Sequence, residues 1–468
     1  MTEQQTPSSP LGEATLAEFQ ASLRGALLRP GNEGYETHRK IWNGMIDRHP
    51  ALIARCAGVA DVISAVQFAR SHHLLVAVRG GGHNVAGNAV CDGGMVIDLS
   101  PMKGVRVDPA ARVVRAQAGV TWGELDRETQ AFGLATTGGI VSTTGISGLT
   151  LGGGIGWLMR KYGLTCDNLL SVDIVTADGR SIVASADEHP DLFWGVRGGG
   201  GNFGIVTSFE YRLHPVSTII GGMVIYPAAL LHEALRFYRD FCASALDELT
   251  TLASLFTAPP EAFIPASLHG TPVMGIVACH CGSPEEAERV LRPLHMFGPP
   301  AVDLLGPMPY SALQTMVDTS YPAGQCYYWK SDYLTDLSDE AIDTILSHRA
   351  RCLSPLSAVD IHQMGGAMAR IDANATAFGH RDAPFLVNTV ASWTTSQEGE
   401  QHVQWARSLS AGLARYSTGT YVNFLTNEGA AGVKAAYDPA AYQRLAALKQ
   451  TYDPTNLFHL NQNIAPRP

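Results

Sequence analysis

The segment Arg79-Gly80-Gly81-Gly82-His83-Asn84 directly follows a short apolar run, Leu74–Val78 (LLVAV). Consecutive glycines let the backbone turn tightly and bring its N–H groups close to an anion, so a pyrophosphate can be held with few side chains. Two further clusters, Gly145–Gly156 (GISGLTLGGGIG) and Gly198–Gly204 (GGGGNFG), offer the same opportunity. Each cluster alone is also typical of a tight turn or of close packing. Together, the three clusters predict one extended ligand.

The sequence around these clusters predicts α/β architecture without a doubly wound Rossmann fold. Helical spacing over Asp61–Ser71 leads into the apolar strand, and further strands are predicted at Gly94–Leu99, Arg112–Ala118 and Leu170–Thr176. The turn Ala177-Asp178-Gly179 predicts a hairpin with Ser181–Val183. No strand, GxGxxG and helix unit is followed by an acidic residue about 20 positions on, so the nicotinamide fingerprint is absent.

After Gly204 the glycine density falls and longer helical patterns begin. Three amphipathic stretches have helix length, at Leu230–Leu249, Pro284–Met296 and Ser338–Leu353. Strands are predicted between and after them, at Val273–His280 and Ala358–Met364. This change predicts a second, α+β subdomain inserted into the first. The chain then returns to a helix over Tyr442–Lys449.

Composition limits the classes of partner. The chain has 468 residues, of which 46% are hydrophobic and 16% charged, typical of a globular protein with two or three packed subdomains. A net charge of −10 argues against nucleic-acid or anionic-membrane binding, which needs a basic face. No apolar run of about 18 residues is present to span a membrane. Residues 1–13 lack a secretory pattern, so we expect a cytoplasmic protein with small-molecule partners.

The eight cysteines are spread along the chain and are interpreted as free thiols. Cys279-His280-Cys281 invites a metal interpretation, but alternate strand residues point to opposite faces and no second ligand pair follows at zinc spacing. We therefore expect no metal.

Four ordered motifs resemble those of the berberine-bridge-enzyme-like oxidases, which belong to the vanillyl-alcohol-oxidase superfamily of FAD enzymes. The resemblance covers roughly residues 40–215 and 420–465. The motifs are Arg79–Asn84 with Asp98-Leu99-Ser100; Thr150–Gly156 with Arg160–Leu164 and Asp167-Asn168; Asp191–Trp194 with Arg197–Gly204; and Tyr452–Phe458 with Asn461–Ile464.

The resemblance implies an α+β fold: a two-part, PCMH-type FAD-binding domain with an inserted α+β substrate domain, an antiparallel sheet flanked by helices. We expect a disordered tail at residues 1–13, the FAD-binding domain at 14–217 and 418–468, and the substrate-binding domain at 218–417.

The resemblance also implies that FAD is bound covalently through its 8α-methyl group to His83. A histidine on a mobile glycine loop can present a neutral nitrogen as a nucleophile near pH 7. The same resemblance assigns further cofactor contacts to Arg79, Gly80, Gly81, Gly82, Asn84, Thr144, Gly145, Gly148, Gly152, Gly153, Asn202, Gly204, Val206, Asn461 and Asn463.

Many relatives make a second flavin bond from a cysteine just before the second glycine cluster. That position is Val141 in this chain, and valine cannot form a thioether. We therefore expect a single histidyl link and no cysteinyl link. Cys166 lies beyond the cluster and is interpreted as a packing residue.

The catalytic group is predicted on the strand Ala358–Met364. Period-two alternation puts Asp360, His362 and Met364 on one face, and a carboxylate beside an imidazole is a candidate general-base pair. A solvated strand face or a structural ion pair is the alternative. By resemblance, a carboxylate on a substrate-domain strand faces the flavin in several relatives, which favours Asp360.

In other relatives the base is the second tyrosine of a Tyr-x-Asn-Tyr motif. This chain has Tyr421-Val422-Asn423-Phe424, so Phe424 replaces that tyrosine and has no proton to exchange. Tyr421 remains a candidate catalytic residue. Two aromatic-rich pieces, Cys326–Lys330 and Phe385–Trp393, are either core or the lining of a pocket for a ring-bearing substrate.

The resemblance implies an FAD-dependent oxidase that removes a hydride from a small secondary-metabolite, aromatic or polyketide-like substrate, with dioxygen as electron acceptor. One alternative is an oxygenase of the enterocin type that uses a flavin-N5-oxide. Residues 48–56, Phe424 and the lone histidine resemble that type, with Thr143 or Thr144 near flavin N5. Carbohydrate or alcohol oxidation and non-catalytic flavin binding are further alternatives. No oligomeric state is predicted.

Overall fold

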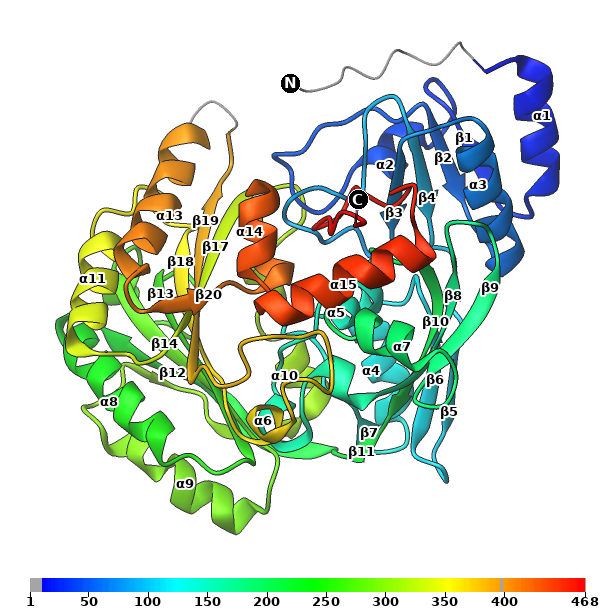
Figure 1. The fold of residues 1–468 in the computed structure, drawn as a ribbon. Helices are drawn as coiled ribbons and strands as arrows, with labels where there is room; N and C mark the ends of the chain where they lie inside the picture. The colour runs from blue at the N-terminus through cyan, green and yellow to red at the C-terminus, as the bar shows by residue number, and fades with distance from the viewer. Residues whose placement is uncertain (1–10, 396–398, 468) are drawn as a thin grey trace.

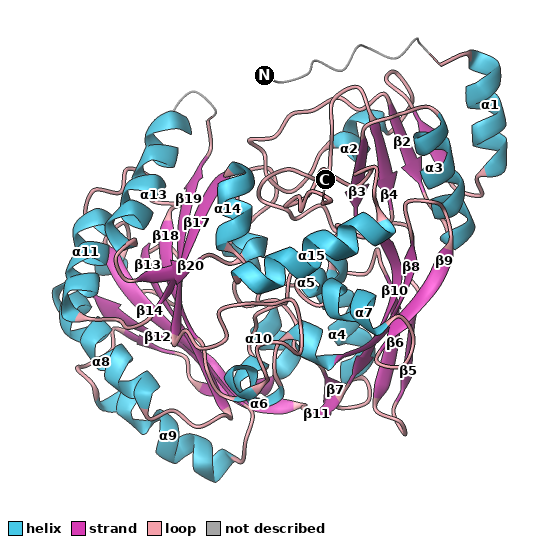
Figure 2. Ribbon diagram, viewed as in Figure 1, coloured by secondary structure: helices cyan, strands magenta, loops and turns pink. Residues whose placement is uncertain are grey.

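The strands form two groups that face each other across the middle of the molecule (Figure 1). The computed structural model describes residues 11–395 and 399–467. It is an α+β structure, with helices covering the outer faces and running between the two groups (Figure 2).

A small sheet carries the first glycine cluster. Its strands are, in spatial order, β1 (Ala26–Leu28), β2 (Leu52–Arg55), β4 (Met95–Asp98) and β3 (Val76–Arg79). β4 pairs in parallel with β2 and β3, and β1 is antiparallel to β2. α3 (Val59–Ser71) leads into β3, as the sequence predicted, and buries Val62 and Val66. Because β3 ends at Arg79, the first glycine cluster begins directly at the end of a buried strand.

The strands that follow β4 in the chain form a second sheet, which is antiparallel. Its strands are β5 (Val105–Asp108), β6 (Val113–Gln117), β10 (Ile205–Arg212), β8 (Leu169–Val175) and β9 (Ser181–Ser185). β8 and β9 form the predicted hairpin. A short pair, β7 (Leu134–Ala135) with β11 (His214–Pro215), closes one end.

The other group is an antiparallel sheet of nine strands within the described residues. In spatial order they are β15 (Val302–Asp303), β12 (Thr218–Pro227), β14 (Pro272–His280), β13 (Leu249–Thr257), β18 (Ala358–Gln363), β19 (Phe385–Trp393), β17 (Cys326–Leu334) and β20 (Ser417–Gly419), with β16 (Gly306–Pro309) also paired to β12.

Four helices cover the outer face of this sheet in Figures 1 and 2. They are α8 (Leu231–Ala243), α9 (Pro284–Met296), α11 (Asp339–Arg349) and α13 (Gly399–Leu413). Tyr238, Leu291 and Ile345 pack from these helices into one core with Val387 of the sheet. The inner face is therefore left to face the glycine-rich part of the molecule.

The predicted helix Leu230–Leu249 is wrong at its end. α8 stops at Ala243, a turn follows, and Leu249 begins β13. β13 is paired on both sides, by β14 and β18, and this pairing overrides the helical pattern of the sequence. The prediction Ser338–Leu353 also shortens, to α11, whose first turn is capped by the Ser338 hydroxyl accepting from Ala341 N–H.

The C-terminal part returns to the glycine-rich group through α14 (Gly429–Ala435) and α15 (Pro439–Tyr452), which runs between the two groups in Figure 1. The Lys449 Nζ is fully buried, 2.7 Å from the Asp453 carboxylate. It also donates to the carbonyls of Asn202 and Phe458, at 2.9 Å each. One buried ammonium therefore ties the third glycine cluster to the C-terminal segment.

At the other end of the chain, α1 (Glu13–Ser22) already begins at Glu13. Residues 1–10 of the predicted tail lie outside the described residues. Among the helices that the structure describes, none combines the length and apolar character needed to cross a bilayer.

Candidate functional site

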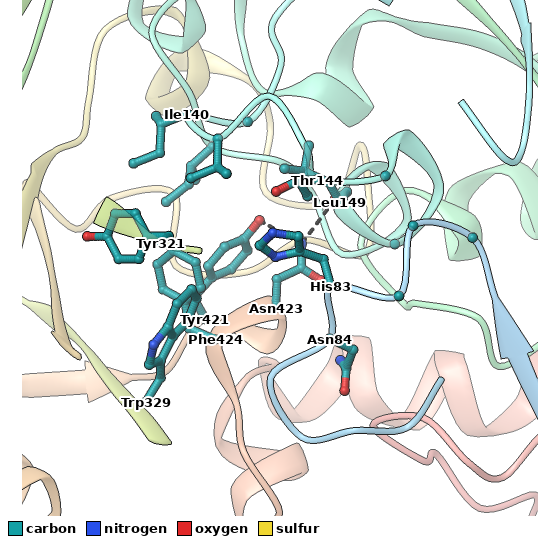
Figure 3. Close-up of a pocket in the computed structure, with 18 of the residues that line it drawn as sticks. His83, Asn84, Ile140, Thr144, Leu149, Tyr321, Trp329, Tyr421, Asn423 and Phe424 are labelled. Carbon is teal, nitrogen blue, oxygen red and sulfur yellow. Dashed lines mark hydrogen bonds between the residues drawn. The ribbon is translucent and has the colours of Figure 1, made fainter. Parts of the chain in front are cut away.

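A cavity lies between the first two glycine clusters and the inner face of the nine-stranded sheet (Figure 3). It encloses about 1110 Å³ of empty space, part of it open to solvent. On the glycine-rich side it is lined by Val78, Gly80, Gly81, Gly82, His83, Asn84, Ala89, Gly139, Ile140, Val141, Thr144, Gly145, Gly148, Leu149 and Ile155. On the other side it is lined by Tyr321, Trp329, Asp360, His362, Asn388, Tyr421, Asn423 and Phe424.

A second cavity adjoins the first and reaches the third glycine cluster. Both cavities are lined by Val78, Gly80, Asn84, Ala89, Gly148 and Asn423. The second continues along Gly152, Gly200, Gly201 and Gly204 to the C-terminal residues Phe458, Leu460, Asn461 and Gln462. The three clusters therefore border two adjoining cavities that share part of their wall, the arrangement expected if a single extended ligand spans both.

Backbone contact between the first two clusters explains why glycine is required there. A Cβ built on Gly81 would lie 2.5 Å from the backbone nitrogen of Gly145, and one on Gly145 would lie 2.5 Å from that of Gly81. A Cβ on Gly152 would lie 2.1 Å from the Asn423 Oδ1. Side chains at these positions would force the loops apart.

The predicted cofactor residues divide into those that border the cavities and those that do not. Bordering the first cavity are Gly80, Gly81, Gly82, His83, Asn84, Thr144, Gly145 and Gly148, and bordering the second are Gly152, Gly204, Val206 and Asn461.

The other four predicted cofactor residues lie behind the cavity walls. The Arg79 guanidinium donates to the His38 carbonyl. A Cβ on Gly153 would meet the Phe378 ring. The Asn202 side chain donates to the carbonyls of Gly199 and Gln462 and accepts from Ile464 N–H. Asn463 has a buried Oδ1 with no partner among the described residues.

His83 presents a neutral imidazole to the first cavity (Figure 3). Its ring stacks on Trp42, with centroids 4.3 Å apart, and Trp42 stacks in turn on Tyr327. Burial lowers the pKa of His83 to about 4, so the ring carries no proton charge at neutral pH. The Nε2 atom lies 3.4 Å from the Thr143 hydroxyl.

Val141, the position predicted to form no second bond to the flavin, borders the same cavity. Its side chain has no nucleophilic atom. Cys166 is fully buried away from both cavities, and burial raises the pKa of its thiol. Cys166 is therefore a packing residue, as expected from the sequence.

Asp360 and His362 lie on the predicted strand and both line the first cavity. The two side chains share one wall of the cavity, as the alternation predicted, but the hydrogen bonds of Asp360 go to residues other than His362. Asp360 accepts from the hydroxyls of Ser254 and Tyr321, at 2.6 Å each. Burial raises the pKa of Asp360. Met364 lies past the end of β18, in the core of the glycine-rich group.

The Tyr421 oxygen accepts two hydrogen bonds, from Gly154 N–H at 3.0 Å and from the Asn423 amide at 2.8 Å (Figure 3). A phenol oxygen has two acceptor positions, so the neutral Tyr421 can only donate to a further partner. Burial raises its pKa, which keeps it protonated. Tyr421 is therefore suited to donate a hydrogen bond and unsuited to accept a proton.

Aromatic rings close the substrate side of the cavity. Phe424 meets Trp329 and Tyr421 edge to face, with centroids 5.2 Å and 4.9 Å apart. Of the two aromatic-rich pieces, Trp329 and Asn388 line the cavity, whereas Tyr328 and Trp393 belong to the core under the outer helices.

Sequence reasoning missed Trp42, Ser254, Tyr321 and Asn388. Trp42 and Tyr321 come from loops that meet in space, since the Trp42 indole donates to the Tyr321 carbonyl at 3.0 Å. Ser254 and Asn388 are brought beside Asp360 by strand register, which periodicity within one strand cannot reveal. Only the aromatic-rich composition of Phe385–Trp393 pointed toward any of them.

The residues present fit an FAD molecule. The two adjoining cavities form one long space walled by glycine backbone, which can approach a pyrophosphate closely. Among the described residues of its wall, Asn461 has a buried Oδ1 without a partner, the kind of acceptor that a ligand hydroxyl satisfies.

Comparison with known proteins agrees with this fit. Residues 50–185 match a family model described as FAD binding domain, and residues 420–465 match one described as berberine and berberine like. The chain is 33% identical to (R)-6-hydroxynicotine oxidase from Paenarthrobacter nicotinovorans, over 95% of this chain and 97% of that protein. It is 32% identical to an FAD-linked oxidoreductase from Dictyostelium discoideum, over 96% of each.

Solved structures share the fold. The crystal structure of 6-hydroxy-D-nicotine oxidase from Arthrobacter nicotinovorans superimposes with a TM-score of 0.87, covering 95% of this chain and 99% of that one at 31% identity. Chitooligosaccharide oxidase has the same fold at 23% identity, with a TM-score of 0.83 over 97% of this chain and 100% of that one. With its PCMH-type fold and its FAD-binding domain, the chain belongs to the berberine-bridge-enzyme-like family of FAD-dependent oxidoreductases.

Proposed function

We propose that this protein is an oxidase that removes a hydride from a small, ring-bearing organic substrate and passes the electrons to dioxygen. The observation that carries the proposal is the shared cavity: the glycine clusters form one wall, and an aromatic and polar sheet face forms the other. When bound, FAD supplies the two-electron redox chemistry, and the protein supplies positioning and electrostatics. The full-length relative named (R)-6-hydroxynicotine oxidase supports the oxidase class.

We assign covalent attachment of the flavin to His83 alone. The support is its neutral ring, its place in the cavity wall and its stack on Trp42, which fixes the ring plane. Val141 at the position of the second link offers no thiol. The remaining cofactor contacts are assigned to the glycine-rich residues that border the two cavities.

Asp360 is assigned as the acceptor of the substrate proton. Its raised pKa makes its carboxylate a stronger base than an exposed one, closer to the operating pH. Each of its oxygens accepts one hydroxyl bond and keeps a further acceptor position. His362, whose pKa burial lowers to about 4, remains a neutral hydrogen-bonding group, and Tyr421 donates.

The first test is acid precipitation of the purified protein, with a visible spectrum of the pellet and peptide mass mapping around His83. We expect a yellow pellet and one flavin on the His83 peptide, and a non-covalent flavin in a His83→Ala variant. A colourless pellet with free FAD in the supernatant would remove the covalent assignment and leave the FAD enzyme standing. Hydrogen peroxide release during turnover tests the oxidase step.

An oxygenase is the second candidate, and the observation that favours it is Phe424. The usual phenol base is absent there, and the Thr143 hydroxyl lies 3.4 Å from the His83 Nε2. Turnover under oxygen-18 gas separates the two: label in the product supports oxygenation, and unlabelled product with peroxide supports the oxidase. A flavin that no substrate reduces would indicate a non-catalytic binder.

A further inference from the structure

A row of polar side chains crosses four adjacent strands on the inner face of the nine-stranded sheet. The strand register pairs Ser254 with Asp360, Asp360 with Asn388, and Asn388 with Ser331. Asp360 is held by Ser254, and Ser331 accepts from the backbone N–H of Tyr421 at 3.1 Å. Three of the four members are therefore satisfied within the protein.

Asn388 is the exception in this row. The residue is 3% exposed and its Oδ1 is buried. Its side-chain amide makes no hydrogen bond within the described residues. A buried amide without a partner costs free energy unless something else satisfies it. Because Asn388 also lines the first cavity, a molecule that enters that cavity can supply the missing partner.

His362 is a second unpaired polar group on the same wall. It is 5% exposed and lines the cavity, and its ring lies 5.9 Å from that of Phe424. Within the described residues its ring nitrogens have no hydrogen-bond partner. Asn388 and His362 are diagonal neighbours on adjacent antiparallel strands, which places them about 7–8 Å apart. One ring-sized molecule can contact both.

The charge of the cavity limits what that molecule is. None of the described residues that line the first cavity is a lysine or arginine, and its sheet wall carries the Asp360 carboxylate, so an anionic group on the substrate would find no cation there. Burying an unpaired charge costs several kcal/mol on general grounds. Trp329, Tyr321 and Phe424 supply aromatic rings to the lining of the same cavity (Figure 3).

We propose that Asn388 and His362 form a specificity subsite that selects a ring-bearing substrate without an anionic group, through a neutral hydrogen-bond donor, a hydroxyl or an amine N–H. This inference rests on the proposed function, since it places the substrate in the cavity that FAD shares. It names two determinants that act by binding and not by proton transfer.

The test is a ligand-observed NMR titration of the full-length protein with four compounds of similar size: benzyl alcohol, aniline, toluene and benzoate. Benzyl alcohol or aniline should bind about threefold to tenfold more tightly than toluene, the worth of one neutral hydrogen bond. Benzoate should bind at least about tenfold more weakly than benzyl alcohol. Whether benzyl alcohol or aniline binds better identifies the donor as hydroxyl or amine.

Two variants assign the effect to the subsite. Asn388→Leu and His362→Leu should each weaken the binding of benzyl alcohol and aniline by about threefold to tenfold. The affinity for toluene should stay unchanged in both variants. The matched control is Thr389→Val, the next residue of β19, which strand alternation places on the same face as Val387 and Ala391 in the core under the outer helices. All four affinities should stay the same in this variant.

Benzoate binding as tightly as benzyl alcohol would overturn the proposal, as would an equal loss of toluene and donor compounds in both variants. The titration detects binding without turnover. A protein that discriminates these compounds, yet turns over a substrate without releasing peroxide, would therefore contradict the oxidase proposal and leave the subsite intact.

Discussion

The two walls of the active cavity are built by different means. On the cofactor side the glycine loops pack backbone against backbone. A Cβ built on Gly81 would lie only 2.5 Å from the backbone nitrogen of Gly145, and the reverse holds as well. On the substrate side the wall consists of side chains projecting from a regular sheet, where the strand register decides the neighbours of Asp360. The cofactor wall therefore depends on which residues have no side chain, and the substrate wall on which side chains meet.

The largest expected effect on stability comes from the buried ion pair of Lys449 and Asp453, which ties the third glycine cluster to the C-terminal segment. Lys449→Met should lower the free energy of unfolding by about 3–5 kcal/mol, because it leaves the fully buried Asp453 carboxylate without its cation. Urea denaturation of flavin-loaded protein measures the loss. The double variant with Asp453→Leu should recover part of it, and a double variant as unstable as the single one would show that the charge is not the cause.

A smaller effect, with a pH signature, is expected on the substrate wall. Burial lowers the pKa of His362 from 6.5 to about 4, so between these values the unfolded chain binds a proton that the folded protein does not. Stability contributed by the neutral ring is therefore present above pH 6.5 and is lost as the pH falls toward 4, by up to about 3 kcal/mol.

Urea denaturation at several pH values between 7 and 4.5 checks this expectation. Between pH 6.5 and 4.5 the free energy of unfolding should fall less in His362→Leu than in the wild type. Above pH 6.5 the two proteins should show the same pH dependence. Parallel pH curves for the two proteins would show that His362 does not titrate in this way.

The next largest expected effect comes from adding a side chain within the cofactor wall. Gly81→Ala places a methyl group against the Gly145 backbone, and overpacking of this kind costs about 1–3 kcal/mol. We expect lower flavin content on purification and a lower unfolding temperature. Gly306→Ala is the matched control, because a Cβ there meets nothing within 4 Å and no residue of β16 lines either cavity. Equal flavin content in both variants would contradict the backbone contact.

The smallest expected effect lies on the far face of the substrate sheet. The Thr389 hydroxyl is buried without a partner among the described residues, one residue from Asn388. Thr389→Val removes an unsatisfied group and should raise the free energy of unfolding by up to about 1 kcal/mol. A loss of stability in thermal unfolding would show that the hydroxyl is satisfied in solution.

The same contrast explains what the sequence could predict. The glycine clusters, the strand before Gly80 and the β8–β9 hairpin depend on local chemistry, and all were predicted near their observed positions. The pairing of Asp360 with Ser254 and Tyr321 depends on a neighbouring strand and on a loop, which the sequence does not specify locally. The end of α8 was missed for the same reason, because β13 takes its structure from its two neighbours.

The second cavity also has a consequence for how the protein is made. Its walls include Gly80 and Gly204 from early in the chain and Phe458 and Asn461 from near position 460. During synthesis, the glycine loops leave the ribosome long before the segment that completes their pocket. The second cavity therefore has a complete wall only after synthesis has reached residue 461.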